Sequence, residues 1–256
     1  MLSSITRGSS PFALPYITPT PTVRYDFTLG YGGNAASAID TSGNSNNGTA
    51  TNFNIGTNWL PNEKSGVVKI PNTSTSNMYI LGPNITHSNI YSVSMGFMVE
   101  SVVSNSTNEI AGAGETTNDT EKWSLAFYDS GGSYALQYFR GTSNQTSTYY
   151  SNFGLALNTW YIVGITNDTT SSGSYPYGYS IFKIWKPASS VENVSINYGY
   201  AAGAAGRIKV GKPRVMTFNY GAGMRLGHFM WWNGTALSDS QHETVATAYK
   251  AKYGLL

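Results

Sequence analysis

The chain has 256 residues and carries few charges. Asp, Glu, Lys and Arg make up 11% of it, against about 25% in ordinary soluble proteins, and the formal net charge is +2. A charge this small and scattered does not favour a nucleic-acid partner. The absence of cysteine excludes disulfides, thiolate nucleophiles and cysteine-bound metals. No apolar run reaches the roughly 18 residues that a membrane span needs.

Residues 1–22 hold four prolines among serines and threonines, which predicts an extended arm without a core of its own. Such arms fray unless something holds them, so we expect a contact with the arm's own domain or, preferably, with a neighbouring chain. The expected assembly residues are Pro11, Phe12, Leu14 and Tyr16. A basic segment followed by an apolar one is absent from the start, so no secretory signal peptide is expected.

Residues 23–256 are expected to form one domain. Short runs with two-residue alternation, separated by Gly- and Asn-rich breaks, are typical of a β-sandwich and not of alternating strands and helices. The expected strands are 67–70, 77–81, 93–99, 123–128, 134–139, 160–165, 179–185, 207–210 and 225–232. Three long polar loops are expected at 104–122, 142–158 and 167–177, and binding surfaces usually lie on such loops.

The last thirty residues carry the clearest pattern. Segment 225–232 has large apolar groups on both alternating faces, which predicts a strand covered on both sides. A helix is predicted after it, because Ser238 and Gln241 form a capping-box pattern and Gly254 suits the left-handed position after the last turn. The expected stripe of the helix is Val245, Ala248, Tyr249 and Lys252.

Three further segments occur in a recognisable order with this C-terminal end. They are 23–27 (Val-Arg-Tyr-Asp-Phe), 40–48 (Asp-Thr-Ser-Gly-Asn-Ser-Asn-Asn-Gly) and 155–163 (Leu-Ala-Leu-Asn-Thr-Trp-Tyr-Ile-Val). Together they resemble the concanavalin A-like, laminin G-like domain family. The resemblance implies an all-β, two-sheet antiparallel jelly-roll sandwich with one short C-terminal helix. It fixes no function, because such folds host lectins, enzymes and structural modules.

The sequence does not favour catalysis. A glycoside hydrolase needs two carboxylates beside the scissile bond, and the Glu-x-Asp-x-x-Glu strand of laminarinase-like relatives does not occur here. Asp119 and Glu121 are spaced by two, but within a polar loop. The three histidines, His87, His228 and His242, lack metal-binding spacing, and His228 is expected to be an ordinary strand residue. We therefore expect no enzyme, with a glucanase-type hydrolase as the least favoured alternative.

Two kinds of ligand remain. Asp40 and Asn44, with neighbouring Ser and Asn side chains, offer hard oxygen ligands for calcium, although the same residues form Asx turns without an ion; no other cofactor is expected. Sugars stack on aromatic rings and bond to amides and carboxylates. The candidate glycan residues are Tyr149, Tyr150, Asn167, Asp168, Tyr175, Tyr177 and Tyr198. The alternative is that these tyrosines pack against sheet edges or a neighbour.

The pattern of a lectin-like sandwich, a proline-rich arm, few charges and no signal peptide favours a non-catalytic structural protein of a virion surface. In this hypothesis the protein decorates a capsid or forms part of a fibre. Its partners would be other virion proteins or copies of itself, with a surface glycan as a further ligand. The alternative is a free carbohydrate-binding module or adhesin, which would be extracellular.

Overall fold

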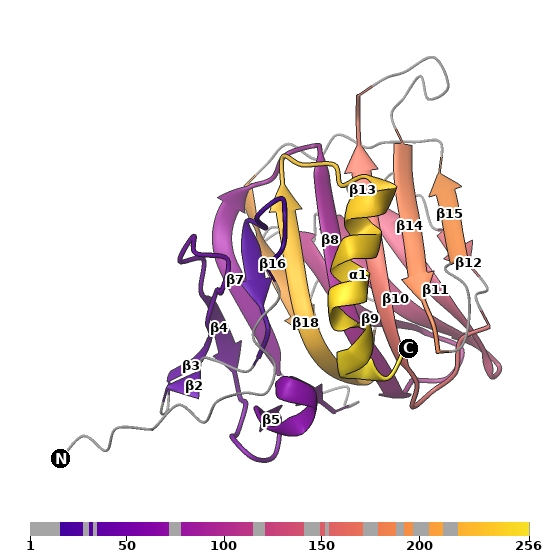
Figure 1. The fold of residues 1–256 in the computed structure, drawn as a ribbon. Helices are drawn as coiled ribbons and strands as arrows, with labels where there is room; N and C mark the ends of the chain where they lie inside the picture. Colours follow the sequence, from indigo (N-terminus) through magenta and orange to yellow (C-terminus); the bar gives the residue numbers. More distant parts are fainter. Residues whose placement is uncertain are drawn as a thin grey trace.

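The structure is a computed structural model that describes residues 16–27, 31–32, 35–71, 78–114, 121–140, 149–151, 154–170, 179–187, 192–196, 205–211 and 220–255. Two β sheets are stacked face to face, and one helix, α1 (Asp239–Tyr253), lies across the outer side of the first sheet (Figure 1). The expected two-sheet antiparallel sandwich with a single C-terminal helix is thus confirmed. Parallel pairing is confined, among the named strands, to β17 beside β9.

The eight-stranded sheet carries the helix. Its order is β15 (Glu192–Ile196), β14 (Tyr179–Trp185), β13 (Trp160–Asp168), β8 (Tyr91–Ser101), β18 (Gly223–Asn233), β6 (Val67–Ile70) and β5 (Trp59–Leu60), with β1 (Val23–Tyr25) paired to β18. A short 3-10 helix, η1 (Glu63–Ser65), lies between β5 and β6 in the chain.

The ten-stranded sheet forms the opposite layer. Its order is β12 (Tyr149–Ser151), β11 (Ser133–Arg140), β10 (Glu121–Ser130), β9 (Thr107–Gly114), β16 (Ala205–Gly211), β7 (Tyr79–Thr86), β4 (Gly48–Thr51), β3 (Ala35–Ala38) and β2 (Tyr31–Gly32), with β17 (Tyr220–Gly221) paired to β9.

Strand β18 is buried on both faces, as its sequence predicts. Phe229 and Trp231 point into the core between the sheets, whereas Met230 and Trp232 point into a second apolar cluster beneath α1. Successive side chains of a strand point to opposite faces, so one strand supplies both layers of packing.

The helix begins and ends where the sequence indicates. Ser238 Oγ accepts the backbone N–H of Gln241 at 3.3 Å, Gln241 Oε1 accepts the N–H of Ser238 at 2.8 Å, and Gly254 is left-handed with φ of 71°. The expected apolar stripe is wrong in part, because Ala248 is exposed. The face that packs on the sheet consists of His242, Val245, Ala246, Tyr249 and Tyr253.

Two predicted loops contain strands. Segment 104–122 includes β9, which lies in the middle of the ten-stranded sheet, and segment 142–158 includes β12 at its edge. The sequence of β9, Thr-Asn-Glu-Ile-Ala-Gly-Ala-Gly, has weak strand propensity. It is nevertheless a strand because Ile110, Ala111 and Ala113 are fully buried in the core. The third loop begins later than expected, since β13 continues to Asp168.

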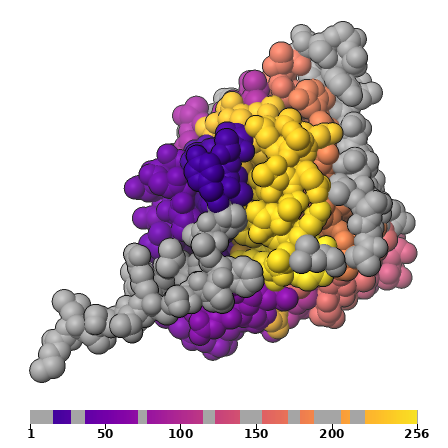
Figure 2. All heavy atoms as spheres, in the orientation of Figure 1, coloured from indigo at the N-terminus to yellow at the C-terminus, as the bar shows by residue number. Residues whose placement is uncertain are grey.

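The N-terminal segment packs on its own sandwich. Ile17 is buried in the apolar cluster that also contains the inner face of α1. Trp232 Nε1 donates to Pro19 O at 2.7 Å, and Thr22 N donates to Trp231 O at 2.7 Å. Figure 2 shows this indigo segment against the yellow C-terminal part. These contacts move the start of the sandwich from residue 23 to Ile17. Of the expected assembly residues, Tyr16 is 88% exposed. Pro11, Phe12 and Leu14 lie outside the described residues.

Candidate functional site

The outer face of the ten-stranded sheet, the side turned away from the core, presents a continuous row of residues. Cross-strand partners lie side by side on the same face of a sheet. The pairings place Ser37, Thr49, Leu81, Lys209, Gly112 and Ser124 in one line across β3, β4, β7, β16, β9 and β10. The residues next to them in each strand, such as Ala50, Ile80 and Val210, belong to the core.

Exposure along this face falls from one end to the other. Thr49 and Asn84 are exposed and Leu81 is half-buried, so the β4–β7 end is open. Ser124 is fully buried, and Lys209, between these ends, is 9% exposed. The face therefore has an open half over β4, β7 and part of β16, and a covered half over β9, β10 and β11.

The covered half holds a second row, which links β12 to the sheet centre. Gln137 is the cross-strand partner of Tyr150 on one side and of Ala126 on the other, and Ala126 pairs with Glu109. Gln137 Oε1 accepts a hydrogen bond from Thr107 Oγ1 at 2.8 Å. The ladder thus places the backbone of Tyr150, a predicted glycan residue, directly opposite Gln137. Glu109 lies two strands further along the same row.

Asn167 is a buried residue of β13 that bonds within the eight-stranded sheet and does not face solvent. Its side chain is fully buried; Nδ2 donates to Asn89 O at 2.7 Å and Oδ1 accepts from Ser180 Oγ at 2.9 Å. A sugar cannot reach an amide in this position, so Asn167 is removed from the candidate glycan site.

The other predicted glycan residues are scattered. Tyr149 begins β12, and its side chain is not among those described. Asp168 ends β13 and accepts the N–H of Thr170 at 2.8 Å, which is an Asx turn. Tyr175, Tyr177 and Tyr198 lie outside the described residues.

The Asp40 loop does not fit a calcium ion. Oδ1 accepts the N–H groups of Arg24 and Ser42, both at 2.9 Å, and Oδ2 accepts Ser42 Oγ at 2.7 Å and Asn46 N at 2.8 Å. Asn44 turns its Nδ2 toward Pro21 O at 3.0 Å. The carboxylate is therefore surrounded by donors, whereas a cation needs its lone pairs. The loop matches the alternative of Asx turns, and it ties β1 to the loop before β4.

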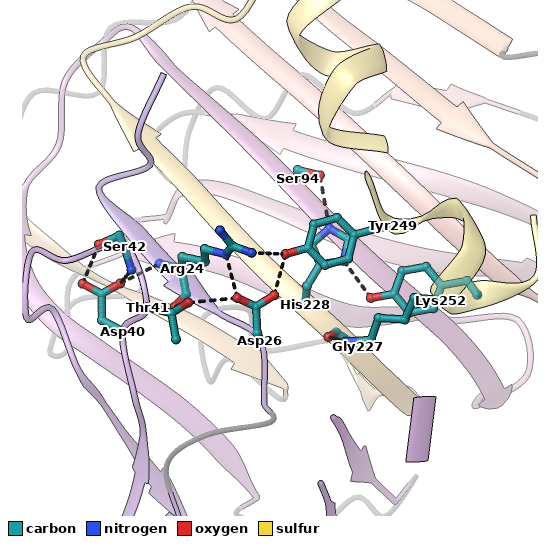
Figure 3. Close-up of polar contacts among 11 residues, drawn as sticks. Arg24, Asp26, Asp40, Thr41, Ser42, Ser94, Gly227, His228, Tyr249 and Lys252 are labelled. Carbon is teal, nitrogen blue, oxygen red and sulfur yellow. Dashed lines mark hydrogen bonds and ion pairs between the residues drawn. The ribbon is translucent and has the colours of Figure 1, made fainter. Parts of the chain in front are cut away.

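A buried polar network lies under α1 on the other sheet (Figure 3). Arg24 Nε donates to Asp26 Oδ2 at 2.6 Å, and Arg24 Nη2 donates to Tyr249 Oη at 2.9 Å. Tyr249 Oη donates in turn to Asp26 Oδ1, and Thr41 Oγ1 donates to Asp26 Oδ2. Arg24 is 6% and Asp26 1% exposed, so this is a buried ion pair that fixes the helix to β1.

His228 extends the network toward the end of the helix. Its Nδ1 bonds Tyr253 Oη at 2.7 Å, its ring stacks on Tyr249 with centroids 4.0 Å apart, and Ser94 Oγ lies 3.3 Å from Nε2. Burial, followed by the charges of Lys252 and Arg24, keeps the pKa of His228 well below its usual value.

Tyr253 lies in a slot between two glycines. A Cβ at Gly96 or Gly227 would come within 2.4 Å of its ring, so both positions require glycine for this packing. Lys252 Nζ donates to Gly227 O, and burial lowers the pKa of Lys252 to about 8.

His242 occupies the first turn of α1 and is 2% exposed. Its Nε2 lies 2.8 Å from Thr166 Oγ1, and Thr166 donates its hydroxyl proton to Leu237 O at 3.1 Å. Nδ1 is buried and makes no hydrogen bond with the described residues. Burial, with the positive charge of Lys183 adding to it, lowers the pKa of His242 to about 4, against an opposing effect of Asp239.

Neither histidine is placed for catalysis. Both are enclosed between helix and sheet, so a substrate has no access to the Ser94–His228 or Thr166–His242 contacts. Within the described ranges, no cluster of three His, Cys, Asp or Glu residues could hold a metal ion. The part of the chain that the structure describes also contains no helix long and apolar enough to cross a membrane.

No known family model matches the sequence, and no curated protein sequence matches it. Solved structures share its fold. A heptameric SAP-like pentraxin from Limulus polyphemus is 14% identical with a TM-score of 0.51, covering 71% of this chain and 81% of that one. The binding domain of botulinum neurotoxin DC in complex with SialylT is 12% identical, with a TM-score of 0.56 and coverage of 90% and 52%.

Trypanosoma rangeli sialidase in complex with sialic acid is 13% identical with a TM-score of 0.58, covering 94% of this chain and 34% of that one. The chain thus spans about half the length of the toxin binding domain and about a third of the sialidase. Identities this low carry information about the fold and not about function. The chain is a jelly-roll sandwich of the concanavalin-like kind.

Proposed function

We propose that this domain is a non-catalytic carbohydrate-recognition module whose ligand lies along the outer face of the ten-stranded sheet. The observation that carries the proposal is the row from Thr49 through Leu81 to Lys209, which is polar at its ends and open over β4 and β7. Tyr79 and Asn84 lie on the same face of β7, half-buried and exposed respectively. Hydroxyls, an amide and an aromatic ring are the groups with which proteins contact sugars.

The non-catalytic part of the proposal rests on the carboxylates of this face. Among the side chains that the structure describes, Glu109 is the single carboxylate on it, at 1% exposure. Hydrolysis of a glycosidic bond needs two carboxyl groups about 5–10 Å apart, one acting as acid and the other as base or nucleophile. One buried carboxylate among the described side chains does not meet that requirement.

The comparisons support a sugar as the ligand class. Two proteins with this fold were solved with saccharides, the neurotoxin DC binding domain with SialylT and the sialidase with sialic acid. The support is an analogy of fold, and the assignment to this face comes from the residues above.

Binding to an array of immobilised glycans tests the proposal. Asn84→Ala and Tyr79→Ala should each reduce the affinity for the best-binding glycan at least tenfold, which corresponds to about 1.4 kcal/mol. Tyr16→Ala is the matched control, because this exposed tyrosine precedes Ile17, which packs in the apolar cluster of α1 on the other sheet, and the change should leave affinity unchanged. Thermal melts of each variant verify folding. Failure to retain any glycan, or equal binding by folded face variants and wild type, would sink the proposal; shortened sugar products would show catalysis.

The second candidate is the structural role on a virion surface. Tyr16 is favoured as its contact residue, since it is 88% exposed directly before the anchored Ile17. A large exposed aromatic next to the anchored Ile17 suits packing against a second chain.

Removal of residues 1–15 together with Tyr16→Ser tests the virion role. We expect a folded, monomeric sandwich that no longer co-assembles with its neighbours, because Ile17 and the residues after it stay in place. Light scattering on size-exclusion fractions measures assembly, and the melting temperature reports the fold. Unchanged assembly by the shortened chain would rule out the arm as the anchor.

A further inference from the structure

We infer that the saccharide recognised on this face carries an acidic group, a carboxylate or a sulfate, and that the Arg207 guanidinium binds it. The inference rests on the proposed function and adds the chemical class of the ligand. Sheet position, neighbouring residues and guanidinium chemistry each support it.

Position is the first support. Arg207 and Lys209 are two residues apart on β16, so both lie on the outer face, whereas Ile208 between them points into the core. Strand β16 lies between β9 and β7 near the middle of the sheet. Two cationic residues therefore occupy adjacent rows at the border between the covered and open halves of the face.

The partners of Arg207 in the ladder are the second support. On the β9 side it pairs with Gly114, which has no side chain, and on the β7 side with exposed Asn84. Glu109 lies five residues from Gly114 along β9, roughly 16 Å at 3.3 Å per residue, too far for an ion pair. Among the side chains that the structure describes, none forms an ion pair with half-buried Arg207. Glu121 lies on the far side of Gly114 in the ladder, so a variant below tests it, and the proposal assigns the charge of Arg207 to a ligand.

Guanidinium chemistry is the third support. The planar fork of arginine donates two parallel hydrogen bonds to a carboxylate or sulfate, and such charge-assisted bonds are roughly twice as strong as neutral ones. Lys209 is 9% exposed, so the contact with the acidic group is assigned to Arg207. Asn84, beside Arg207, adds an amide for the sugar hydroxyls. Together these groups match an acidic sugar better than a neutral one.

Titration calorimetry with matched pairs of sugars tests the inference. The probes are sialyllactose against lactose, and oligogalacturonate against its methyl ester. At least one acidic probe should bind tenfold or more tighter than its neutral partner, and higher salt should reduce that difference. Arg207→Gln should abolish the preference and leave neutral binding as it was, whereas Arg207→Lys should retain part of it.

Two control variants separate recognition from other effects. Lys69→Gln removes the same charge from the other sheet, where Lys69 is 3.3 Å from Glu100, and should keep the preference. Glu121 pairs with Gly114, and its strand is two strands from that of Arg207. Glu121→Gln therefore tests whether Arg207 forms an ion pair with the carboxylate of Glu121. The inference predicts unchanged or stronger acidic binding in Glu121→Gln.

The outcomes are distinguishable. If no probe and no arrayed glycan binds, the proposed function fails. If acidic and neutral partners bind equally, or if Arg207→Gln weakens both by the same factor, the acidic preference is overturned while carbohydrate recognition stands. If Arg207→Gln and Glu121→Gln lose the same amount of unfolding free energy, Arg207 has a structural role, and the acidic preference is also overturned.

Discussion

Acidification from pH 7 to pH 4 should remove about 3 kcal/mol of folding stability through His242 alone, by the 1.36 kcal/mol that each pKa unit represents. The pKa of His242 is about 4 in the folded chain, against 6.5 as its ordinary value. Between these values the unfolded chain binds the proton and the folded chain does not. Stability from this group is therefore complete above pH 6.5, declines as the pH falls, and is lost once the pH passes about 4.

The geometry explains the direction. Protonation would place a proton on His242 Nδ1, which faces the backbone at Gly164 with no acceptor, near the ammonium of Lys183. His228 acts in the same direction, because its pKa is also well below the ordinary value and Lys252 and Arg24 face it. Carboxylates with lowered pKa, Glu243 among them, add their own loss at the acidic end.

Urea denaturation at pH 7, 6, 5 and 4 measures the effect as the change of unfolding free energy with pH. His242→Gln is the control, since its amide can still donate to Thr166 but does not titrate. The variant should show a shallower slope between pH 6.5 and 4, whatever its stability at pH 7. Identical slopes in wild type and His242→Gln would contradict the account of this histidine.

Asp26→Ala is expected to cost about 3–5 kcal/mol, the usual penalty for stranding a buried charge. Asp26 accepts hydrogen bonds from Arg24, Thr41 and Tyr249, and Arg24 is 6% exposed. Without Asp26, the buried guanidinium loses the carboxylate that balances its charge. The helix would lose the hydrogen bond from Tyr249 to Asp26 and keep the one that Tyr249 accepts from Arg24 of β1.

Equilibrium unfolding of the double variant Arg24→Met/Asp26→Leu is the matched comparison. Replacing both charges with apolar groups of similar volume leaves no stranded ion, so the double variant should be more stable than Asp26→Ala. A cost below about 1 kcal/mol for Asp26→Ala would indicate that the pair is solvated and would contradict its burial.

Local patterns predicted local structure well. The capping box of Ser238 and Gln241 and the glycine at 254 define α1 because caps depend on neighbours within a few residues. The double-sided apolar pattern of 225–232 likewise identified β18 as a covered strand. Strand β14 also has the predicted bounds.

Long-range contacts were beyond such patterns. Asp26 and Tyr249 are 223 residues apart, and no spacing in the sequence announces their hydrogen bond. Strand β9 was missed because its small residues gain strand conformation from burial and not from propensity. The calcium hypothesis counted oxygen atoms at Asp40, whereas the donors that fill that carboxylate come largely from the backbone.

The proposed binding face could be predicted in part. Arg207 and Lys209 alternate with Ile208 in a strand that the sequence predicts, so a shared face for the two cations follows from the pattern. Their position beside Gly114, Gly112 and Asn84 required the register. The tyrosine-rich loops are visible as short segments of the sequence. A sheet face built from six strands is not, because its residues are far apart in the chain.

Amide chemical-shift mapping with the best-binding saccharide tests the location of the site most directly. The account predicts that the largest perturbations fall on β16, β7 and β4, at Arg207, Asn84 and Thr49, and that they saturate with the affinity measured by calorimetry. Perturbations confined to the helix side of the eight-stranded sheet, or to residues far from these three strands, would contradict it.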